Sequence, residues 1–163
     1  MAHGYAINNP GNIRKSTIMW IGEVVPGSDA DFVTFSSISY GYRAMFVLLK
    51  NYINKGYNTI DKIINRWAPS SENNTQAYIT HVVQLTGISS DTIIEFSNAE
   101  NMQKIVAAIA YHENGSAPNF TDVQAGYALT GEIATVQTGG ISVAAVAFVA
   151  AIAAIAYKTL KIK

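Results

Sequence analysis

Apolar residues recur at helical spacing through the middle of the chain, and this pattern begins at Tyr40. One face stays apolar from there to Gly56, and glycine commonly follows the end of a helix. Thr59 can cap a shorter second helix that ends before Pro69. A third helix is expected over about 74–86. The spacing therefore predicts three successive helices.

Two further helices are predicted downstream. Ser97, with Glu100 three residues later, has the sequence of a capping box. The helix that follows carries residues 102–113 and meets a glycine two residues later. A last helix starts near Thr121 and fades by Gly131. This part of the chain is therefore expected to be mainly α.

The segment 1–38 has a different pattern. It lacks helical periodicity and is rich in Gly, Asn, Pro and Ser. FVTFSS at 32–37 can form a short strand, and IGEVV at 21–25 can pair with it. We expect loops with a small β-hairpin near the N-terminus.

The C-terminal segment ISVAAVAFVAAIAAIAY, residues 141–157, has no charge, proline or glycine, and lysines follow it. As a helix it would be about 25 Å long, close to the ~30 Å hydrocarbon core of a bilayer. A buried helix of a soluble domain would have a similar composition, whereas an interfacial helix would be striped rather than apolar all round. We expect a transmembrane anchor at 141–163, joined by a linker at 136–140 to a domain at 1–135.

Composition narrows the possible partners. Only 13% of residues are charged and the net charge is zero, so nucleic acid is not expected as a partner. The chain has no cysteine, its three histidines do not match a metal motif, and no glycine-rich phosphate loop occurs, so we expect no metal or cofactor. Residues 1–12 lack a basic region followed by an apolar run, so no secretory signal is expected.

Glu113 is the acidic residue with the most informative position. Counting back by helical steps reaches Ile109, Val106 and Met102, so its carboxylate should share the inward face of the helix. A carboxyl group on an apolar face loses hydration, which raises its pKa and suits it to act as a general acid. A glutamate at a helix end is also commonly solvated, or paired with a neighbour such as His112.

Several short motifs follow one another over roughly residues 5–130. They are NNPGNIR at 8–14, WIG at 20–22, FVTFSS at 32–37, YGYRA at 40–44, INRWAPSSENNTQAYITHV at 64–82 and HENG at 112–115. Together they resemble phage virion-associated, peptidoglycan-degrading proteins of the lysozyme-like superfamily, of the lytic transglycosylase or glucosaminidase type. The resemblance implies a small helical lysozyme-like domain. In those families the catalytic glutamate precedes the other motifs, whereas here Glu113 comes last, so we expect a circularly permuted arrangement.

The resemblance also implies roles for individual residues. Glu113 would be the general acid, and the loop at 8–14 would shape the cleft and donate hydrogen bonds to N-acetyl or peptide oxygens. Tyr78 would steady the acid or the intermediate, although its helical position also fits the core, and Asn12 and Arg14 also fit a turn and a surface charge. The expected substrate-binding residues are Asn9, Asn12, Arg14, Trp20 and Tyr78.

The expected function is that of a membrane-anchored phage virion enzyme that cleaves the bond between N-acetylmuramic acid and N-acetylglucosamine in peptidoglycan. No second carboxylate is well placed, which favours attack by the 2-acetamido group of the substrate. Both a lytic transglycosylase, which is the expected enzyme, and a hydrolase are compatible with that step. The expected partners are glycan strands, lipid through residues 141–157, and possible contacts with other capsid or membrane proteins. The expected location is the membrane of a membrane-containing phage, or the host membrane during infection. One alternative is a non-catalytic virion protein that keeps the fold and binds membrane or cell wall, and another is a membrane-perforating lysis factor.

Overall fold

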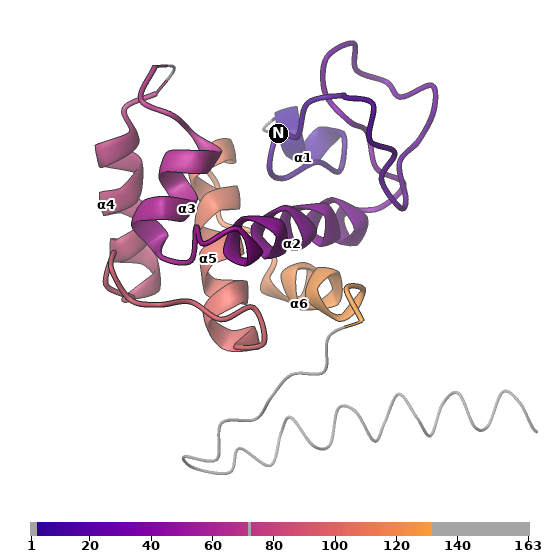
Figure 1. The fold of residues 1–163 in the computed structure, drawn as a ribbon. Helices are drawn as coiled ribbons and strands as arrows, with labels where there is room; N and C mark the ends of the chain where they lie inside the picture. Colours follow the sequence, from indigo (N-terminus) through magenta and orange to yellow (C-terminus); the bar gives the residue numbers. More distant parts are fainter. Residues whose placement is uncertain (1–2, 72, 132–163) are drawn as a thin grey trace, which may run out of the picture.

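The chain is mainly helical in the computed structural model, which describes residues 3–71 and 73–131 (Figure 1). None of the helices among these residues is long and apolar enough to cross a bilayer, and the predicted anchor at 141–163 lies outside them. The helices are α1 (His3–Ala6), α2 (Ile38–Asn54), α3 (Ile60–Trp67), α4 (Thr75–Thr86), α5 (Ala99–Asn114) and α6 (Phe120–Ala128).

The predicted helices are confirmed, and their ends follow local chemistry. The Thr59 hydroxyl caps α3 by accepting a hydrogen bond from the backbone N–H of Lys62 at 3.3 Å. The side chain of Asn74 caps α4 in the same way. Gly87 ends α4 with a φ of 69°, a left-handed conformation that glycine adopts without a steric penalty.

The capping box predicted at Ser97 is wrong by one residue. The N-cap of α5 is Asn98, whose side chain accepts a hydrogen bond from the backbone N–H of Asn101 at 3.1 Å. This start places Glu100 at the second helical position, whereas a capping box requires the third. Glu100 pairs instead with Lys104, one turn along the exposed surface, at 2.6 Å.

The predicted β-hairpin is reduced to two isolated antiparallel bridges among the described residues. Glu23 pairs with Phe35, which joins the two segments expected to form strands, and Arg14 pairs with Phe32. The chain turns next to the Glu23 bridge, where a carboxylate oxygen of Glu23 accepts the backbone N–H of Trp20 at 3.0 Å. The N-terminal region is therefore a set of loops above α2.

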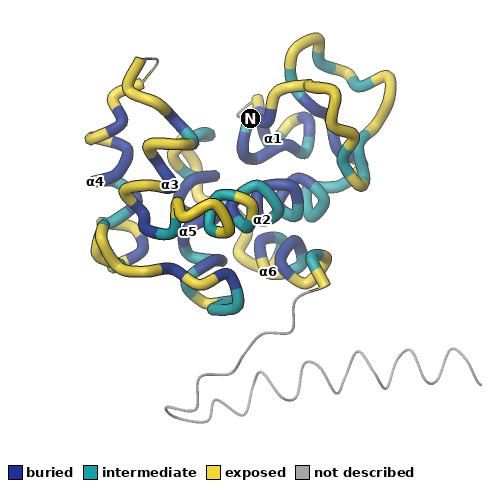
Figure 2. The backbone as a smooth tube through the Cα atoms, viewed as in Figure 1, coloured by how far each residue is buried: buried dark blue, intermediate teal, exposed yellow. Residues whose placement is uncertain are grey.

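Helix α2 lies across the middle of the structure, with α6 on one side and α1 and the N-terminal loops on the other (Figure 1). Helices α3, α4 and α5 form a group at one end of α2, where α4 packs against both α3 and α5. Figure 2 shows that the buried stretches of these helices face one another, while the loop tips are exposed. This arrangement places the C-terminal end of α5 beside the N-terminal loops. Helix α1, which lies within that N-terminal region, also packs against α5.

The contact between α2 and α6 depends on the absence of a side chain at Gly126. A Cβ atom added there would lie 2.4 Å from the Cβ of Tyr42 and 3.0 Å from the backbone nitrogen of Arg43. The ring of Tyr127 then packs edge-on against Phe46, with ring centroids 5.1 Å apart. Close approach of the two backbones is thus built into the sequence of α6.

We predict that Gly126→Ala lowers the free energy of unfolding by about 1–3 kcal/mol, because the added methyl group must push α6 away from α2. Chemical denaturation of the full chain measures the change. Gln124→Ala, at an exposed position of the same helix, is the control and should change stability by less than about 0.5 kcal/mol. Equal effects of the two substitutions would contradict the packing described here.

Candidate active site

Glu113 lies where the periodicity of α5 predicts, on the inward side of its last turn. Ile109, Val106 and Met102, which precede it on the same face, are fully buried, and Glu113 itself is half-buried. The helix ends two residues later at Gly115, whose φ is 65°. The carboxylate is therefore carried by a rigid helix at the border between the core and the surface.

Three hydrogen bonds from three separate segments meet at this carboxylate. The indole Nε1 of Trp67, the last residue of α3, donates to Oε1 at 3.1 Å, and the hydroxyl of Tyr78 in α4 donates to the same oxygen at 2.9 Å. The amide Nδ2 of Asn12, in the N-terminal loop, donates to Oε2 at 3.1 Å. Because the donors approach from different directions, the side chain of Glu113 is held in one orientation.

The donors are all uncharged. A carboxylate that leaves water loses hydration free energy, and hydrogen bonds from neutral groups restore part of it. Each carboxylate oxygen offers about two lone pairs. Oε1 uses both for Trp67 and Tyr78, whereas Oε2 receives only Asn12 among the described residues. Oε2 is therefore the oxygen that can exchange a proton with a bound molecule.

Tyr78 acts as a fixed neutral donor. Its side chain is 3% exposed, and its pKa is raised far above the usual value for tyrosine. Burial is the largest cause, followed by the negative charge of Glu113 and the hydrogen bond between the two side chains. The hydroxyl therefore keeps its proton over the whole range in which proteins remain folded.

The loop at 8–14 is fixed against α5 by asparagine side chains. The amide of Asn114, the residue after Glu113, donates to the carbonyl oxygen of Pro10 at 2.8 Å and to that of Ala110 at 2.9 Å. Asn12 itself has a φ of 47°, a left-handed conformation that asparagine tolerates better than most residues. The loop thus presents Asn12 to the carboxylate.

Asn9 holds this loop together and has a different role from the one expected. It is fully buried, so it cannot reach a substrate. Its Nδ2 donates to the carbonyl oxygens of Ile13 and Val33 at 2.9 and 2.8 Å, and its Oδ1 accepts the backbone N–H of Ile13. The expectation that Asn9 binds substrate is therefore corrected to a structural role.

Of the other expected residues, Asn12 and Tyr78 contact Glu113, whereas Arg14 and Trp20 lie apart from it. The guanidinium of Arg14 is exposed and lies 5.0 Å from the ring centroid of Phe32. Trp20 is only half exposed and packs against the core, with its indole nitrogen buried. The structure therefore brings together two of the five residues expected to bind substrate.

Trp67 is a site residue that helical spacing alone assigns to the core. The sequence offers one indication of a second role, which is the position of Trp67 directly before Ala68 and Pro69. Because the helix ends there, its last side chain can reach a neighbouring segment. Tryptophan often places its ring in the core and its N–H against a polar partner. Helical spacing of apolar residues predicts where the ring packs, but it does not predict the partner of the indole N–H.

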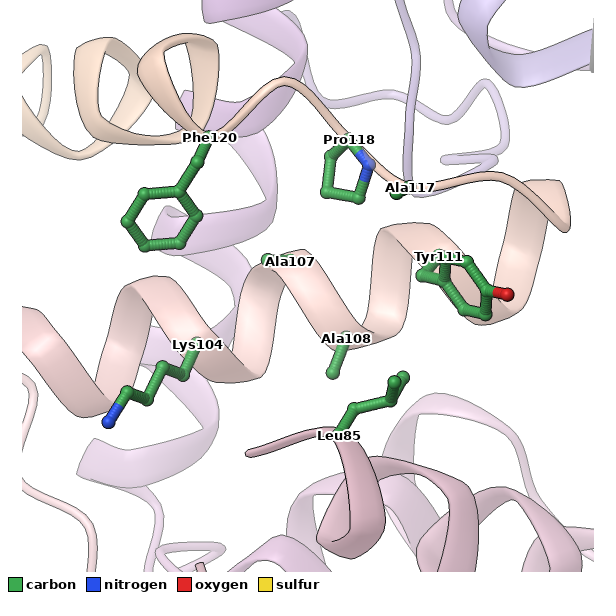
Figure 3. Close-up of a pocket in the computed structure, with 8 residues that line it drawn as sticks. All are labelled: Leu85, Lys104, Ala107, Ala108, Tyr111, Ala117, Pro118 and Phe120. Carbon is green, nitrogen blue, oxygen red and sulfur yellow. The ribbon is translucent and has the colours of Figure 1, made fainter. Parts of the chain in front are cut away.

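A groove with a volume of about 350 Å³ lies on another face of α5 (Figure 3). Tyr111, which lines it, is two residues from Glu113, and two residues correspond to a rotation of about 200° around the helix. This groove is therefore distinct from the carboxylate site. It is not the substrate cleft that the sequence predicts beside Glu113. Its lining residues are Leu85, Lys104, Ala107, Ala108, Tyr111, Ala117, Pro118 and Phe120.

Comparison with known proteins provides one phage relative. No family model matches the chain. The chain is 34% identical over 131 residues to Protein P5 of Pseudoalteromonas phage PM2, a match that covers 77% of this chain and 80% of that protein. This level and extent of identity indicate common descent along most of both chains.

We predict that Tyr78→Phe lowers the free energy of unfolding by about 1.5–3 kcal/mol when Glu113 is present, because it removes a hydrogen bond to a carboxylate. In a Glu113→Ala background the same change should have a smaller effect, and a double-mutant cycle measures the difference. Tyr57→Phe, at an exposed tyrosine, is the control. If Tyr78→Phe has the same effect in both backgrounds, the hydroxyl does not act on Glu113.

Proposed function

The chain belongs to the same family as Protein P5 of Pseudoalteromonas phage PM2, and we propose that it is a phage virion enzyme that cleaves the glycan strands of peptidoglycan. Glu113 is the proposed acid and base, and the bond between N-acetylmuramic acid and N-acetylglucosamine is the proposed target. The phage relative supports the setting, and the resemblance of the motifs to lysozyme-like proteins supports the substrate class.

The observation that carries this proposal is the half-buried carboxylate of Glu113, which neutral donors from a loop and two helices hold in one orientation. Solvated surface glutamates do not need such a set of donors, and structural buried carboxylates are usually paired with a cation. An oriented carboxyl group with a free lone pair suits proton transfer to and from a bound substrate.

In the first proposed step, a proton on Oε2 of Glu113 passes to the glycosidic oxygen as the bond from that oxygen to the sugar C1 breaks. Glu113 is the carboxylate of the hydrogen-bond network described here, and no second carboxylate takes part in it. The 2-acetamido oxygen of the substrate is therefore the proposed nucleophile, and it bonds to C1 as the leaving sugar departs.

In the second step, Glu113 acts as a base and takes the proton of the C6 hydroxyl of the same sugar. The C6 oxygen bonds to C1, the acetamido oxygen leaves C1, and the carboxyl group of Glu113 is protonated again. This sequence gives a 1,6-anhydro product and defines a lytic transglycosylase. If water replaces the C6 hydroxyl, the same groups perform hydrolysis.

The proposal includes attachment to a membrane through residues 141–157. Their uninterrupted apolar character supports it, and lysines at 158, 161 and 163 would keep the short tail on one side of the bilayer. Attachment of this kind would place the enzyme in the membrane of a membrane-containing phage until entry brings it to the cell wall.

We predict that the full chain clears peptidoglycan in a zymogram and that Glu113→Gln lowers the rate by at least about 10²-fold, because the amide cannot supply a proton. Glu100→Gln is the matched control, since Glu100 is an exposed carboxylate on the same helix. Mass spectrometry of the released muropeptides should show products lighter than hydrolysis products by one water. A wild-type chain that leaves peptidoglycan intact would instead favour a non-catalytic virion protein.

We further predict that the full chain floats with phospholipid vesicles in a density gradient. Val149→Asp, in the middle of the apolar run, should reduce the floating fraction, because an acidic residue at the centre of a bilayer is unfavourable by about 2.5–3.5 kcal/mol. Thr159→Asp, beyond the apolar run, is the control. Equal flotation of both variants would argue against a membrane-spanning segment.

A further inference from the structure

Two histidines form a pair on the outer side of Tyr78. The ring of His112 stacks face to face on the ring of Tyr78, with centroids 3.5 Å apart and an angle of 10° between the ring planes. The Nδ1 atoms of His112 and of His81, in α4, lie 2.9 Å apart and share a hydrogen bond. Tyr111 contacts the ring of His81 edge-on. The pair links α4 to the last turn of α5, next to Glu113.

We propose that His112 is a positioning residue for Tyr78 and Glu113, that His81 holds it in place, and that double protonation of the pair releases this contact in acid. The effect on catalysis rests on the proposed function, whereas the effect on the geometry of Glu113 does not. Neither histidine touches the carboxylate in the contacts described, so both act through Tyr78.

The hydrogen bond between the two Nδ1 atoms limits how many protons the pair can hold. One ring must donate its Nδ1–H and the other must accept with a bare Nδ1. A first added proton can enter at the Nε2 of the donor ring, which leaves the bond intact. A second proton must enter at the accepting Nδ1, so that two N–H groups and two positive charges face each other.

The charges that act on His112 come from both helices. Its pKa is lowered from the usual 6.5, first by burial and then by the charge of His81, while Glu113 acts in the opposite direction. The other titratable groups in contact with the pair are two tyrosines, Tyr78 against His112 and Tyr111 against His81. A lowered histidine pKa means that the folded form favours neutral imidazole, so the stack is intact near and above pH 6.5 and is lost as the pH falls further.

Tyr78 is the link between the pair and the carboxylate. Its inner surroundings belong to the core, and its outer ring face is the one that His112 covers. Release of His112 would expose that face and loosen the hydroxyl that donates to Oε1 of Glu113. Since Trp67 donates to the same oxygen, the indole N–H of Trp67 reports the change directly.

The test compares His81→Gln and His81→Leu in the full chain by following the indole N–H resonance of Trp67 in NMR spectra across pH. Trp20 is the reference for its assignment, and His3→Gln, which alters a histidine paired with Asp29 instead, is the control. A glutamine amide can donate to neutral His112 and accept from protonated His112, whereas leucine can do neither. Glu113 remains in both variants, so any spectral change that arises from Glu113 alone is common to all samples.

We expect the Trp67 resonance of His81→Gln to match that of the wild type at neutral pH. As the pH falls, the resonance in His81→Gln should lack the part of the shift that arises from the histidine pair. His81→Leu should already be displaced at neutral pH, with kcat lowered roughly tenfold and KM unchanged, because a misplaced catalytic group mainly slows the chemical step. Identical Trp67 shifts in wild type and His81→Gln at every pH would overturn the proposal, even if His81→Leu does not fold. If Glu113→Gln retains activity while the Trp67 shifts follow this expectation, the proposed function fails and the positioning role stands.

Discussion

The last turn of α5 is the constraint on which the site depends. Two consecutive side chains there connect it to other segments: Glu113 receives donors from the N-terminal loop, α3 and α4, and Asn114 donates to the carbonyl oxygen of Pro10. A shift of α5 by one residue would turn both side chains away from these partners by about 100°. The buried residues on the inner face of α5 fix its register, so the apolar packing of the helix sets the geometry of its polar end.

The N-terminal loops meet this helix end because small residues allow the backbones to approach. A Cβ atom added at Gly41 would lie 2.0 Å from the carbonyl oxygen of Asn8, so α2 can support the loop only with glycine at that position. The buried side chain of Asn9 then supplies the hydrogen bonds that neighbouring strands would supply in a sheet. A segment with little regular structure is thereby held firmly enough to present Asn12 to a carboxylate.

The sequence predicted the parts of the structure that follow from local chemistry. Helical spacing located α3 and α4, the cap at Thr59 marked the start of α3, and the same spacing placed Glu113 on the inner face of α5. The shift of the α5 cap from Ser97 to Asn98 shows the limit, because adjacent residues with similar capping ability cannot be ranked from the sequence alone.

The remaining parts depend on contacts between distant residues. Trp67 and Glu113 are 46 residues apart, and His81 and His112 are 31 apart, so neither pairing has a local signal. The hairpin was predicted longer than it is. Apolar residues at 32–37 indicate strand conformation, but they do not indicate how far the pairing extends. The lysozyme-like ancestry, the circular permutation and the membrane anchor stay predictions.

In the proposed function, Glu113 contributes to bond cleavage rather than to binding. The most direct measurement is the single-turnover rate, together with the dissociation constant, for one defined glycan oligomer with wild-type protein and with Glu113→Gln. We expect similar dissociation constants and a rate that falls by at least about 10²-fold. A rate that falls only as far as binding weakens would contradict this expectation.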